Sequence, residues 1–276
     1  MITSTANPRV KAALALRKRR ERDRTGRFLV EGRRELARAL AAGVEVEEVL
    51  ACPPLLARAA SASGEREAGV VHQAATAGAR VVEVADTVFA RLSYRDNPDG
   101  VLGVALAFDT GLDAVGLAGV ADPLVLVVAE LEKPGNLGTM LRSASAAGAA
   151  AVIVADPVTD VFNPNVVRSS QGALFGVPVG VGETGAVVAW LRRHRLRVYA
   201  AGPGGSQPYW RLPLAGPCAL VVGSEHRGLP AEWFDAADER VVIPMPGSGG
   251  VDSLNAAAAA AVLLFDAVRQ RAAAEG

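Results

Sequence analysis

The stretch LVLVVAELEKPGNLGTMLR, residues 124–142, decides the fold class of this chain. Its first six residues, 124–129, form a continuous apolar run, which is typical of a strand that is buried on both faces. The polar residues that follow lead through Pro134-Gly135 into a helix that we expect to continue to Gly148. The stretch therefore predicts a strand-to-helix unit of a parallel sheet.

Short apolar runs of the same kind recur through the C-terminal half, separated by helical stretches. They are residues 151–155, 177–179, 197–201, 218–222 and 240–243. Because such runs alternate with helices, we expect an α/β fold whose parallel sheet is covered on both sides.

The first 108 residues also alternate between helical and strand patterns. Strands are expected from Phe28 and over 44–50, 80–84 and 101–107, and helices over 7–24, 33–42, 55–60 and 86–92. Residues 109–122 are rich in Gly, Asp and Ala and have weak periodicity. We therefore expect an N-terminal domain over 1–108, a linker over 109–121 and a second domain over 122–276.

Charge is distributed unevenly along the 276 residues. The chain has 29 Lys+Arg and 29 Asp+Glu, but residues 1–34 hold 11 basic and 3 acidic residues, which leaves 18 and 26 for the rest. Such a local positive segment favours contact with a polyanion, with nucleic acid as the first candidate, over a solvated helix face. The candidate RNA contacts are Arg17, Lys18, Arg19, Arg20, Arg22, Arg24 and Arg27.

Composition excludes several classes of protein. Half of the residues are hydrophobic and 21% are charged, so disorder is excluded. The two cysteines, Cys52 and Cys218, exclude a disulfide framework and a Cys-rich zinc site, and we expect no metal. The longest apolar run, 256–265, is about half of a membrane span, so we expect a cytoplasmic protein without a membrane partner.

A first candidate motif follows the strand at 124–129. Asn136 and Arg142 are six residues apart, so they do not share a helix face by the i,i+4 rule. If Asn136 caps the helix and Arg142 lies in its second turn, both can still point at the cleft where open α/β sheets bind ligands. The alternative is a capped helix with an exposed arginine.

A second candidate motif lies between Leu220 and Pro230. Gly223 and Gly228 bracket Glu225, which lets the backbone approach a ligand while the carboxylate makes an oriented contact. The alternative is an ordinary strand-to-helix turn. His226 is more often solvated than catalytic in such a place, because no second His or Cys lies at metal spacing.

A third candidate motif is the Gly-rich loop from Val241 to Asn255, which opens an Ala-rich helix. Free backbone amides there can hold a nucleoside or a carboxylate, although the loop lacks dinucleotide and P-loop fingerprints. Ser253 can be the helix N-cap. Asn255, placed in the first turn before six alanines, is a poor helix former and indicates another purpose.

Taken in this order, the motifs resemble those of the SpoU-type (TrmH family) RNA 2′-O-ribose methyltransferases of the knotted SPOUT superfamily. Asn136, Gly138, Arg142 and Gly148 resemble its first motif, and Gly223, Glu225 and Gly228 its second. Ile243-Pro244-Met245 with Ser253-Leu254-Asn255 resembles its third. Phe28-Leu29-Val30-Glu31-Gly32 and the polar cluster 93–100 resemble the family's N-terminal RNA-binding domain.

The resemblance implies a C-terminal trefoil-knotted methyltransferase domain that binds S-adenosylmethionine and forms a homodimer whose active sites use both chains. It places Gly223, Ile243, Met245 and Leu254 at the cofactor. It assigns activation of the ribose 2′-hydroxyl to Arg142, in a site shaped by Asn136, Glu225, Ser253 and Asn255. Arg168 lies in another stretch that resembles the family and is a further RNA contact.

We therefore expect a two-domain methyltransferase of RNA. Large-subunit (23S) rRNA is the preferred substrate and tRNA the alternative. The ratio of 26 Arg to 3 Lys and the richness in Ala indicate a GC-rich genome, which fits an antibiotic-resistance role as well as a housekeeping one. The hypothesis from another class is a non-catalytic RNA-binding protein, which has no reason to keep all five polar site residues. A nucleotide-dependent oxidoreductase lacks its phosphate fingerprint.

Overall fold

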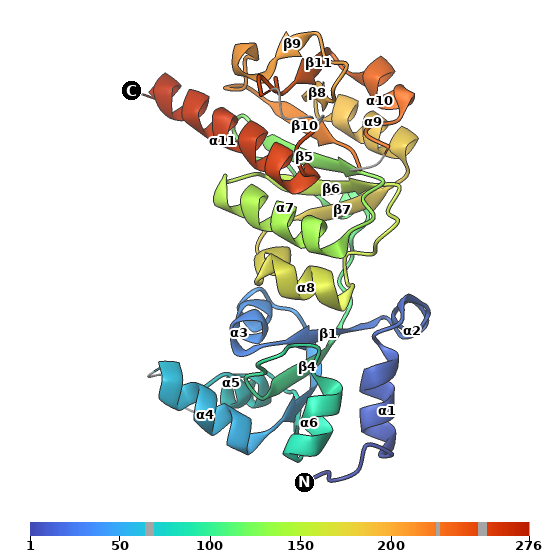
Figure 1. The fold of residues 1–276 in the computed structure, drawn as a ribbon, viewed down its shortest axis with the longest axis vertical. Coiled ribbons are helices and arrows are strands. Elements are labelled where there is room, and N and C mark those ends of the chain that lie inside the picture. The colour runs from blue at the N-terminus through green and yellow to red at the C-terminus, as the bar shows by residue number, and fades with distance from the viewer. Residues whose placement is uncertain (64–68, 225–226, 248–252, 276) are drawn as a thin grey trace. The chain divides into compact units, whose positions relative to one another are not determined.

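A computed structural model of the chain describes residues 1–63, 69–224, 227–247 and 253–275 (Figure 1). They form two compact units. Unit 1 contains Met1–Phe108 and Asp160–Gly176, and unit 2 contains Asp109–Thr159 and Val177–Gly276. The segment 160–176 lies within the second domain expected from the sequence, but it packs in unit 1.

Unit 1 is built on a four-stranded mixed sheet in the order β1-β4-β2-β3. β4 runs antiparallel to β1 and β2, and β3 runs parallel to β2. The strands are β1 (Arg27–Glu31), β2 (Val46–Ala51), β3 (Arg80–Glu83) and β4 (Val101–Leu106). The helices are α1 (Pro8–Ala15), α2 (Arg19–Thr25), α3 (Arg33–Ala41), α4 (Pro53–Ser63), α5 (Gly69–Thr76), α6 (Asp86–Leu92), α8 (Pro164–Ser170) and the 3₁₀ turn η2 (Ala173–Phe175).

The N-terminal basic segment forms two helices, where the sequence predicts one over 7–24. α1 ends at Ala15 and α2 begins at Arg19. The break is stabilised because the buried Arg22 guanidinium donates a hydrogen bond to the carbonyl of Leu16 (2.8 Å), which a continuous helix would use internally. The positive charges of the segment are therefore presented by two separate helices.

The segment 160–176 is held in unit 1 by an aromatic cluster. Phe28 of β1 packs on Phe162 (ring centroids 4.8 Å apart) and on Phe175 (6.3 Å), and Phe108 packs edge-on against Phe162 (4.9 Å). Phe28 is fully buried, so its ring packs in the core of unit 1. The buried ring of Phe28 and the three half-buried rings around it make a large apolar contribution, which explains why this stretch packs in unit 1 and not in unit 2, which flanks it in sequence.

Unit 2 contains a seven-stranded sheet in the order β7-β6-β5-β10-β8-β11-β9, and every neighbouring pair is parallel. Its strands are β5 (Leu124–Ala129), β6 (Ala151–Ala155), β7 (Val179–Gly182), β8 (Arg197–Ala201), β9 (Gln207–Pro208), β10 (Cys218–Val222) and β11 (Glu239–Val242). Its helices are α7 (Pro134–Ala146), α9 (Thr184–Arg193), α10 (Ala231–Ala236) and α11 (Ala256–Glu275), with the 3₁₀ turns η1 (Leu112–Ala114) and η3 (Tyr209–Arg211).

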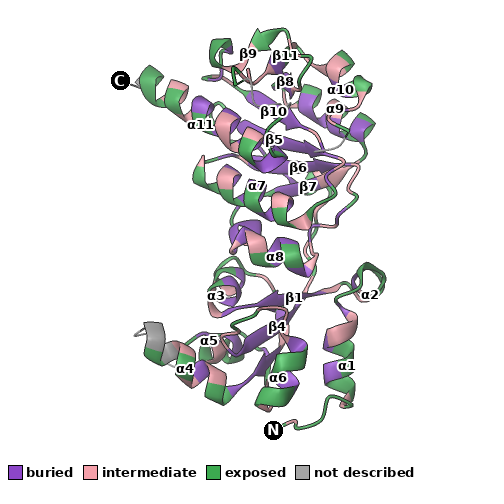
Figure 2. Ribbon diagram, viewed as in Figure 1, coloured by how far each residue is buried: buried purple, intermediate pink, exposed green. Residues whose placement is uncertain are grey.

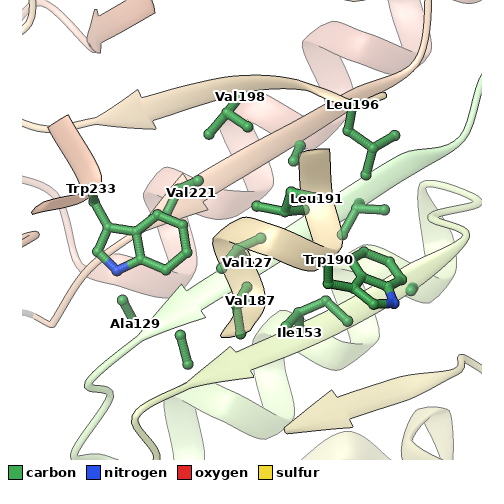
Figure 3. Packing of buried hydrophobic residues seen from close by; sticks show 14 of the residues in the cluster. Val127, Ala129, Ile153, Val187, Trp190, Leu191, Leu196, Val198, Val221 and Trp233 are labelled. Carbon is green, nitrogen blue, oxygen red and sulfur yellow. The ribbon is translucent and has the colours of Figure 1, made fainter. Parts of the chain in front are cut away.

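Helices cover both faces of this sheet, and its central strands are buried throughout (Figures 1 and 2). α7 and α11 pack against each other on one side. On the other side Trp190 of α9 and Trp233 of α10 enter the core beside Val127, Ile153 and Val221 (Figure 3). The expected α/β class, with a parallel sheet and a smaller N-terminal α/β part, is confirmed. The trefoil crossing stays a prediction from the resemblance.

In the part of the chain that the structure describes, no helix combines the length and the hydropathy that crossing a membrane requires. This agrees with the short apolar run noted in the sequence.

Candidate active site

The loops that carry the three motifs leave the same edge of the sheet because their strands run in the same direction. β10 lies between β5 and β8, and Val222 pairs with both Val128 and Ala201. β11 is the next strand, with Val241 beside Ala201. Since all four strands are parallel, the loops that leave their C-terminal ends lie at one edge of the sheet, where open α/β sheets bind ligands.

A cavity of about 370 Å³ opens at this edge. Gly223, Ile243, Met245 and Leu254, the four residues expected at a cofactor, all line it. Ser253, expected in the catalytic set, lines it as well. The remaining lining residues are Ala201, Gly202, Pro203, Val222, Ser224, Arg227, Gly228, Val242, Ala256 and Ala259. The volume lies in the range of small-molecule sites, and the wall is mainly apolar with exposed backbone groups.

The loop after β10 closes tightly on itself. Ser224 and Gly228 exchange two backbone hydrogen bonds, and a side chain on Gly223 would overlap the carbonyl of Gly228. The close approach of two backbone segments therefore requires a glycine at position 223. Gly223 also lines the cavity, where the resemblance places a cofactor contact. Glu225, placed in the catalytic set by the resemblance, and His226 lie outside the described residues.

Asn255 has a role that the sequence analysis did not assign. α11 begins at Ala256, and the Asn255 Oδ1 atom accepts hydrogen bonds from the backbone N–H groups of Ala257 (3.0 Å) and Ala258 (3.3 Å). Asn255 is thus the N-cap of α11, whereas we expected it inside the first turn and Ser253 at the cap. Helix capping alone explains an Asn before six alanines.

Asn136 also differs from the expected position. α7 begins at Pro134 with Lys133 as N-cap residue, so Asn136 is the third helical residue and does not cap the helix. Its side-chain Nδ2 atom is buried and has no hydrogen-bond partner among the described residues. A buried amide donor without a partner is costly, and it is available to a group absent from the structure.

Arg142 is exposed on α7, in the third turn instead of the second. Six residues correspond to about 600° of helix rotation and about 9 Å of rise. The side chains of Arg142 and Asn136 therefore point in directions about 120° apart around the helix axis. Neither lines the cavity of its own chain. The structure thus brings together the second and third motifs around the cavity and leaves Arg142 of the first outside it.

Sequence reasoning missed the loop after β8. Ala201, Gly202 and Pro203 line the cavity, and a side chain on Gly202 would overlap the ring of Phe234. The signal was present, because an apolar strand that ends in Gly-Pro marks a strand end beside a turn. The loop was missed because the sequence does not show which strands are neighbours, and only the strand pairing in the structure places β8 beside β10.

The basic segment of unit 1 divides into engaged and solvent-facing side chains. Arg22 is buried and forms an ion pair with Asp160. Arg17 donates to three backbone carbonyls at the end of α6, and Arg27 pairs with Glu47. Arg24 is bound to Glu21 at an exposed site, where the salt bridge lowers the pKa of the Glu21 carboxyl. These contacts show that part of the segment has structural partners.

The other candidate RNA contacts are exposed. They are Lys18, Arg19 and Arg20 at the start of α2, and Arg168 on α8. Arg19 lies 3.6 Å from Asp23, a weak exposed pair. Arg168 donates to the side chain of Asn165 (3.3 Å). The contact of all these residues with RNA stays a prediction.

In residues 1–63, 69–224, 227–247 and 253–275, the His, Cys, Asp and Glu side chains form no group of three that could hold a metal ion.

Comparison with known proteins identifies the family. Residues 123–265 match the family model described as the SpoU rRNA Methylase family, and residues 7–103 match the MRM3-like substrate binding domain. The chain belongs to the SpoU rRNA methylase family, as the resemblance of the three motifs implied.

Three relatives show how much of the chain this similarity covers. A 23S rRNA (uridine(2479)-2′-O)-methyltransferase of Streptomyces viridochromogenes is 32% identical over 92% of this chain and 86% of its own. A solved structure of an RNA 2′-O ribose methyltransferase is 41% identical, with a TM-score of 0.81 over 98% of this chain and 99% of its own. The SpoU methyltransferase AviRb from Streptomyces viridochromogenes, solved in complex with the cofactor AdoMet, is 31% identical, with a TM-score of 0.84 over 97% of this chain and 100% of its own.

Proposed function

We propose that this protein transfers a methyl group from S-adenosylmethionine to a ribose 2′-hydroxyl of 23S rRNA. The observation that carries the proposal is the cavity at the sheet edge, whose lining includes all four of the residues expected at the cofactor. The relative from Streptomyces viridochromogenes supports the substrate, because its name states a 2′-O position of 23S rRNA. The AdoMet complex of AviRb supports the cofactor.

The cavity fits S-adenosylmethionine in size and in chemistry. Ile243, Met245 and Leu254 offer apolar surface, and the backbone at Gly223 and Gly202 offers polar groups at close range. These are the contacts that an adenosine and its ribose require. When bound, S-adenosylmethionine supplies an electrophilic methyl group on a sulfonium centre.

Arg142 is the proposed catalytic residue, and its chemistry limits what it can do. The 2′-oxygen bonds to the methyl carbon as the carbon–sulfur bond breaks, S-adenosylhomocysteine leaves, and the hydroxyl proton passes to solvent water. A guanidinium keeps its own proton in proteins, so Arg142 cannot accept the proton of the hydroxyl. We assign to Arg142 the binding of a neighbouring phosphate and the stabilisation of negative charge developing on the 2′-oxygen. Asn136, Glu225, Ser253 and Asn255 are the residues proposed to shape this site.

A homodimer with shared active sites is the second part of the proposal. Arg142 is exposed and does not line the cavity of its own chain, which supports a role toward the cavity of a second copy. Phe265 on α11 is 49% exposed and Trp210 on η3 is 51% exposed. Large exposed apolar side chains on unit 2 are typical of a subunit interface.

The proposed function has a direct test. The protein is incubated with methyl-labelled S-adenosylmethionine and, separately, with 23S rRNA, 16S rRNA and bulk tRNA. We expect label in 23S rRNA and about 100-fold or more loss of rate in Arg142→Ala. Cofactor affinity should be retained, because the proposed contacts of Arg142 are with the RNA phosphate and the 2′-oxygen. Label in tRNA alone would overturn the rRNA assignment. Binding of RNA without binding of S-adenosylmethionine would favour the non-catalytic RNA-binding hypothesis.

Mixed dimers test the shared active site. Arg142→Ala removes the proposed catalytic residue, and Leu254→Asp places a charge in the cofactor cavity. Each variant therefore lacks one of the two parts that a shared active site requires. If each site uses both chains, mixing the two inactive variants forms dimers with one intact site and restores activity. Activity that stays absent in mixed dimers, verified by two affinity tags, would contradict the shared site.

A further inference from the structure

Arg227 is the one ionisable side chain among the described residues that line the cavity. The other lining residues are glycines, alanines, larger apolar side chains, one proline and two serines. Arg227 is exposed, so its guanidinium is reachable from solvent. Among the described residues, the cavity therefore combines an uncharged wall with one positive charge.

The backbone of Arg227 is held in place by the loop after β10. Its N–H donates to the Oγ atom of Ser224 (3.2 Å), and Ser224 is buried. The two backbone hydrogen bonds between Ser224 and Gly228 close the loop on either side. The guanidinium is therefore presented from a fixed base, which lowers the entropy cost of its contact with a ligand.

We propose that Arg227 forms the subsite for the carboxylate of the ligand in this cavity. The inference rests on the proposed function, in which that ligand is S-adenosylmethionine. The cofactor carries one carboxylate, one ammonium and one sulfonium group. A carboxylate that leaves water needs a charged or multiply hydrogen-bonded partner, and a guanidinium matches it with two parallel hydrogen bonds. Arg227 is the one charged partner of this kind among the described lining residues.

The same charge determines which end of the cofactor lies beside Arg227. A guanidinium repels a sulfonium and attracts a carboxylate, so the amino-acid end of the ligand faces the loop after β10. The apolar residues Ile243, Met245 and Leu254 are then left for the nucleoside end. An RNA phosphate is another oxyanion that Arg227 could bind, but the side chain lines the cavity itself, which favours the ligand inside it.

Calorimetric binding of three small ligands to the full chain tests this subsite. The ligands are S-adenosylmethionine, S-adenosylhomocysteine and 5′-methylthioadenosine, which lacks the amino-acid carboxylate. We expect Arg227→Gln to weaken the first two by about tenfold or more, as for the loss of a charge-assisted hydrogen bond, and to leave 5′-methylthioadenosine within about twofold. The loss of affinity should be at least as large for S-adenosylhomocysteine as for S-adenosylmethionine. Removing Arg227 also removes its repulsion of the sulfonium, which only S-adenosylmethionine carries.

Arg211→Gln is the matched control, since Arg211 is an exposed arginine of unit 2 that does not line the cavity. It should leave all three affinities unchanged. Equal losses of all three ligands in Arg227→Gln would assign the residue to loop structure and overturn the proposal. Unchanged S-adenosylmethionine affinity with weaker 23S rRNA binding would assign Arg227 to a phosphate instead. Failure of the wild-type chain to bind any of the three ligands would overturn the proposed function together with the subsite.

Discussion

Ser224 and Gly228 exchange two backbone hydrogen bonds, of 3.2 Å from Ser224 N–H to the Gly228 carbonyl and 3.0 Å in the return direction. This pair closes the loop after β10 directly at the wall of the cavity. The closure brings the Gly228 carbonyl so near to Gly223 that no side chain fits there. The geometry of the cavity therefore depends on one glycine.

Substitution of that glycine should impair cofactor binding. In Gly223→Ala the added methyl group overlaps the Gly228 backbone, and such overpacking costs about 1–3 kcal/mol. We expect about tenfold weaker binding of S-adenosylmethionine by calorimetry. Gly216→Ala is the control, because a Cβ there meets nothing within 4 Å. Equal affinities of the two variants would show that the loop can shift without disturbing the cavity.

The capping role of Asn255 can be separated from a role in catalysis. Asn255→Ala should lower the free energy of unfolding by about 1 kcal/mol, because the N–H groups of Ala257 and Ala258 lose their acceptor. Asn255→Asp keeps an acceptor oxygen and should keep the stability in urea denaturation. If Asn255→Asp is stable but slow in methyl transfer, the amide also serves the reaction. Full activity of a stable Asn255→Asp would limit the residue to capping.

Substitutions of Arg22 and Arg20 should differ greatly in their effect on stability although both residues lie in one basic segment. Arg22 is 5% exposed and pairs with Asp160, so Arg22→Ala leaves a largely buried carboxylate without its partner. We expect a loss of about 3–5 kcal/mol in unfolding free energy. Arg20→Ala is the exposed control and should stay within about 0.5 kcal/mol.

The RNA affinity of Arg20→Ala tests the proposed RNA contact of this exposed arginine. Arg20→Ala should weaken 23S rRNA binding and reduce the dependence of affinity on salt, as expected for one lost phosphate contact. Filter binding over a salt series measures this. A salt dependence identical to that of the wild type would remove Arg20 from the RNA surface.

Glu31 should make the stability of unit 1 depend on pH. Burial raises the pKa of its carboxyl above the ordinary value of 4.5, against the hydrogen bonds from Ser93 and Tyr94, which lower it. The folded state therefore holds this proton more tightly than the unfolded state, and the contribution of Glu31 to stability falls as pH rises from 4.5 through the raised pKa.

Glu31→Gln isolates that contribution, because glutamine is the uncharged analogue at every pH. The difference in unfolding free energy between the wild type and Glu31→Gln should decrease as pH rises through this window. Urea denaturation at several pH values measures the difference. Parallel curves for the two proteins would show that the carboxyl does not titrate differently on folding.

Continuous apolar runs predicted the central strands well, because strands buried on both faces leave a strong signal. The run 177–179 was misplaced, because β7 begins only at Val179 and continues to Gly182. The run 124–129 is β5, and 197–201 is β8, residue for residue. β9 was missed because Gln207–Pro208 is a two-residue edge strand without periodicity. The division of 7–24 into two helices was missed because it depends on a tertiary contact, the hydrogen bond from Arg22 to Leu16.

At the candidate active site, too, the sequence did not predict features that depend on local or tertiary contacts. Gly223, Ile243, Met245 and Leu254 were expected at a cofactor from the motifs, and all four line the cavity, while their contact with the cofactor stays a prediction. The positions of Asn136 and Asn255 in their helices were wrong by a few residues, because helix ends are determined by local capping contacts that periodicity does not report. Arg227 lies next to a recognised motif, but its place on the cavity wall follows from the fold of the loop.

The measurement that tests the central claim most directly is nucleoside mass spectrometry of 23S rRNA after incubation with the protein and S-adenosylmethionine bearing a deuterated methyl group. The account predicts one labelled nucleoside whose methyl group stays with the ribose when the base is cleaved. A label that leaves with the base, or RNA that stays unlabelled while the protein binds the cofactor and 23S rRNA, would contradict 2′-O-ribose methylation of this substrate.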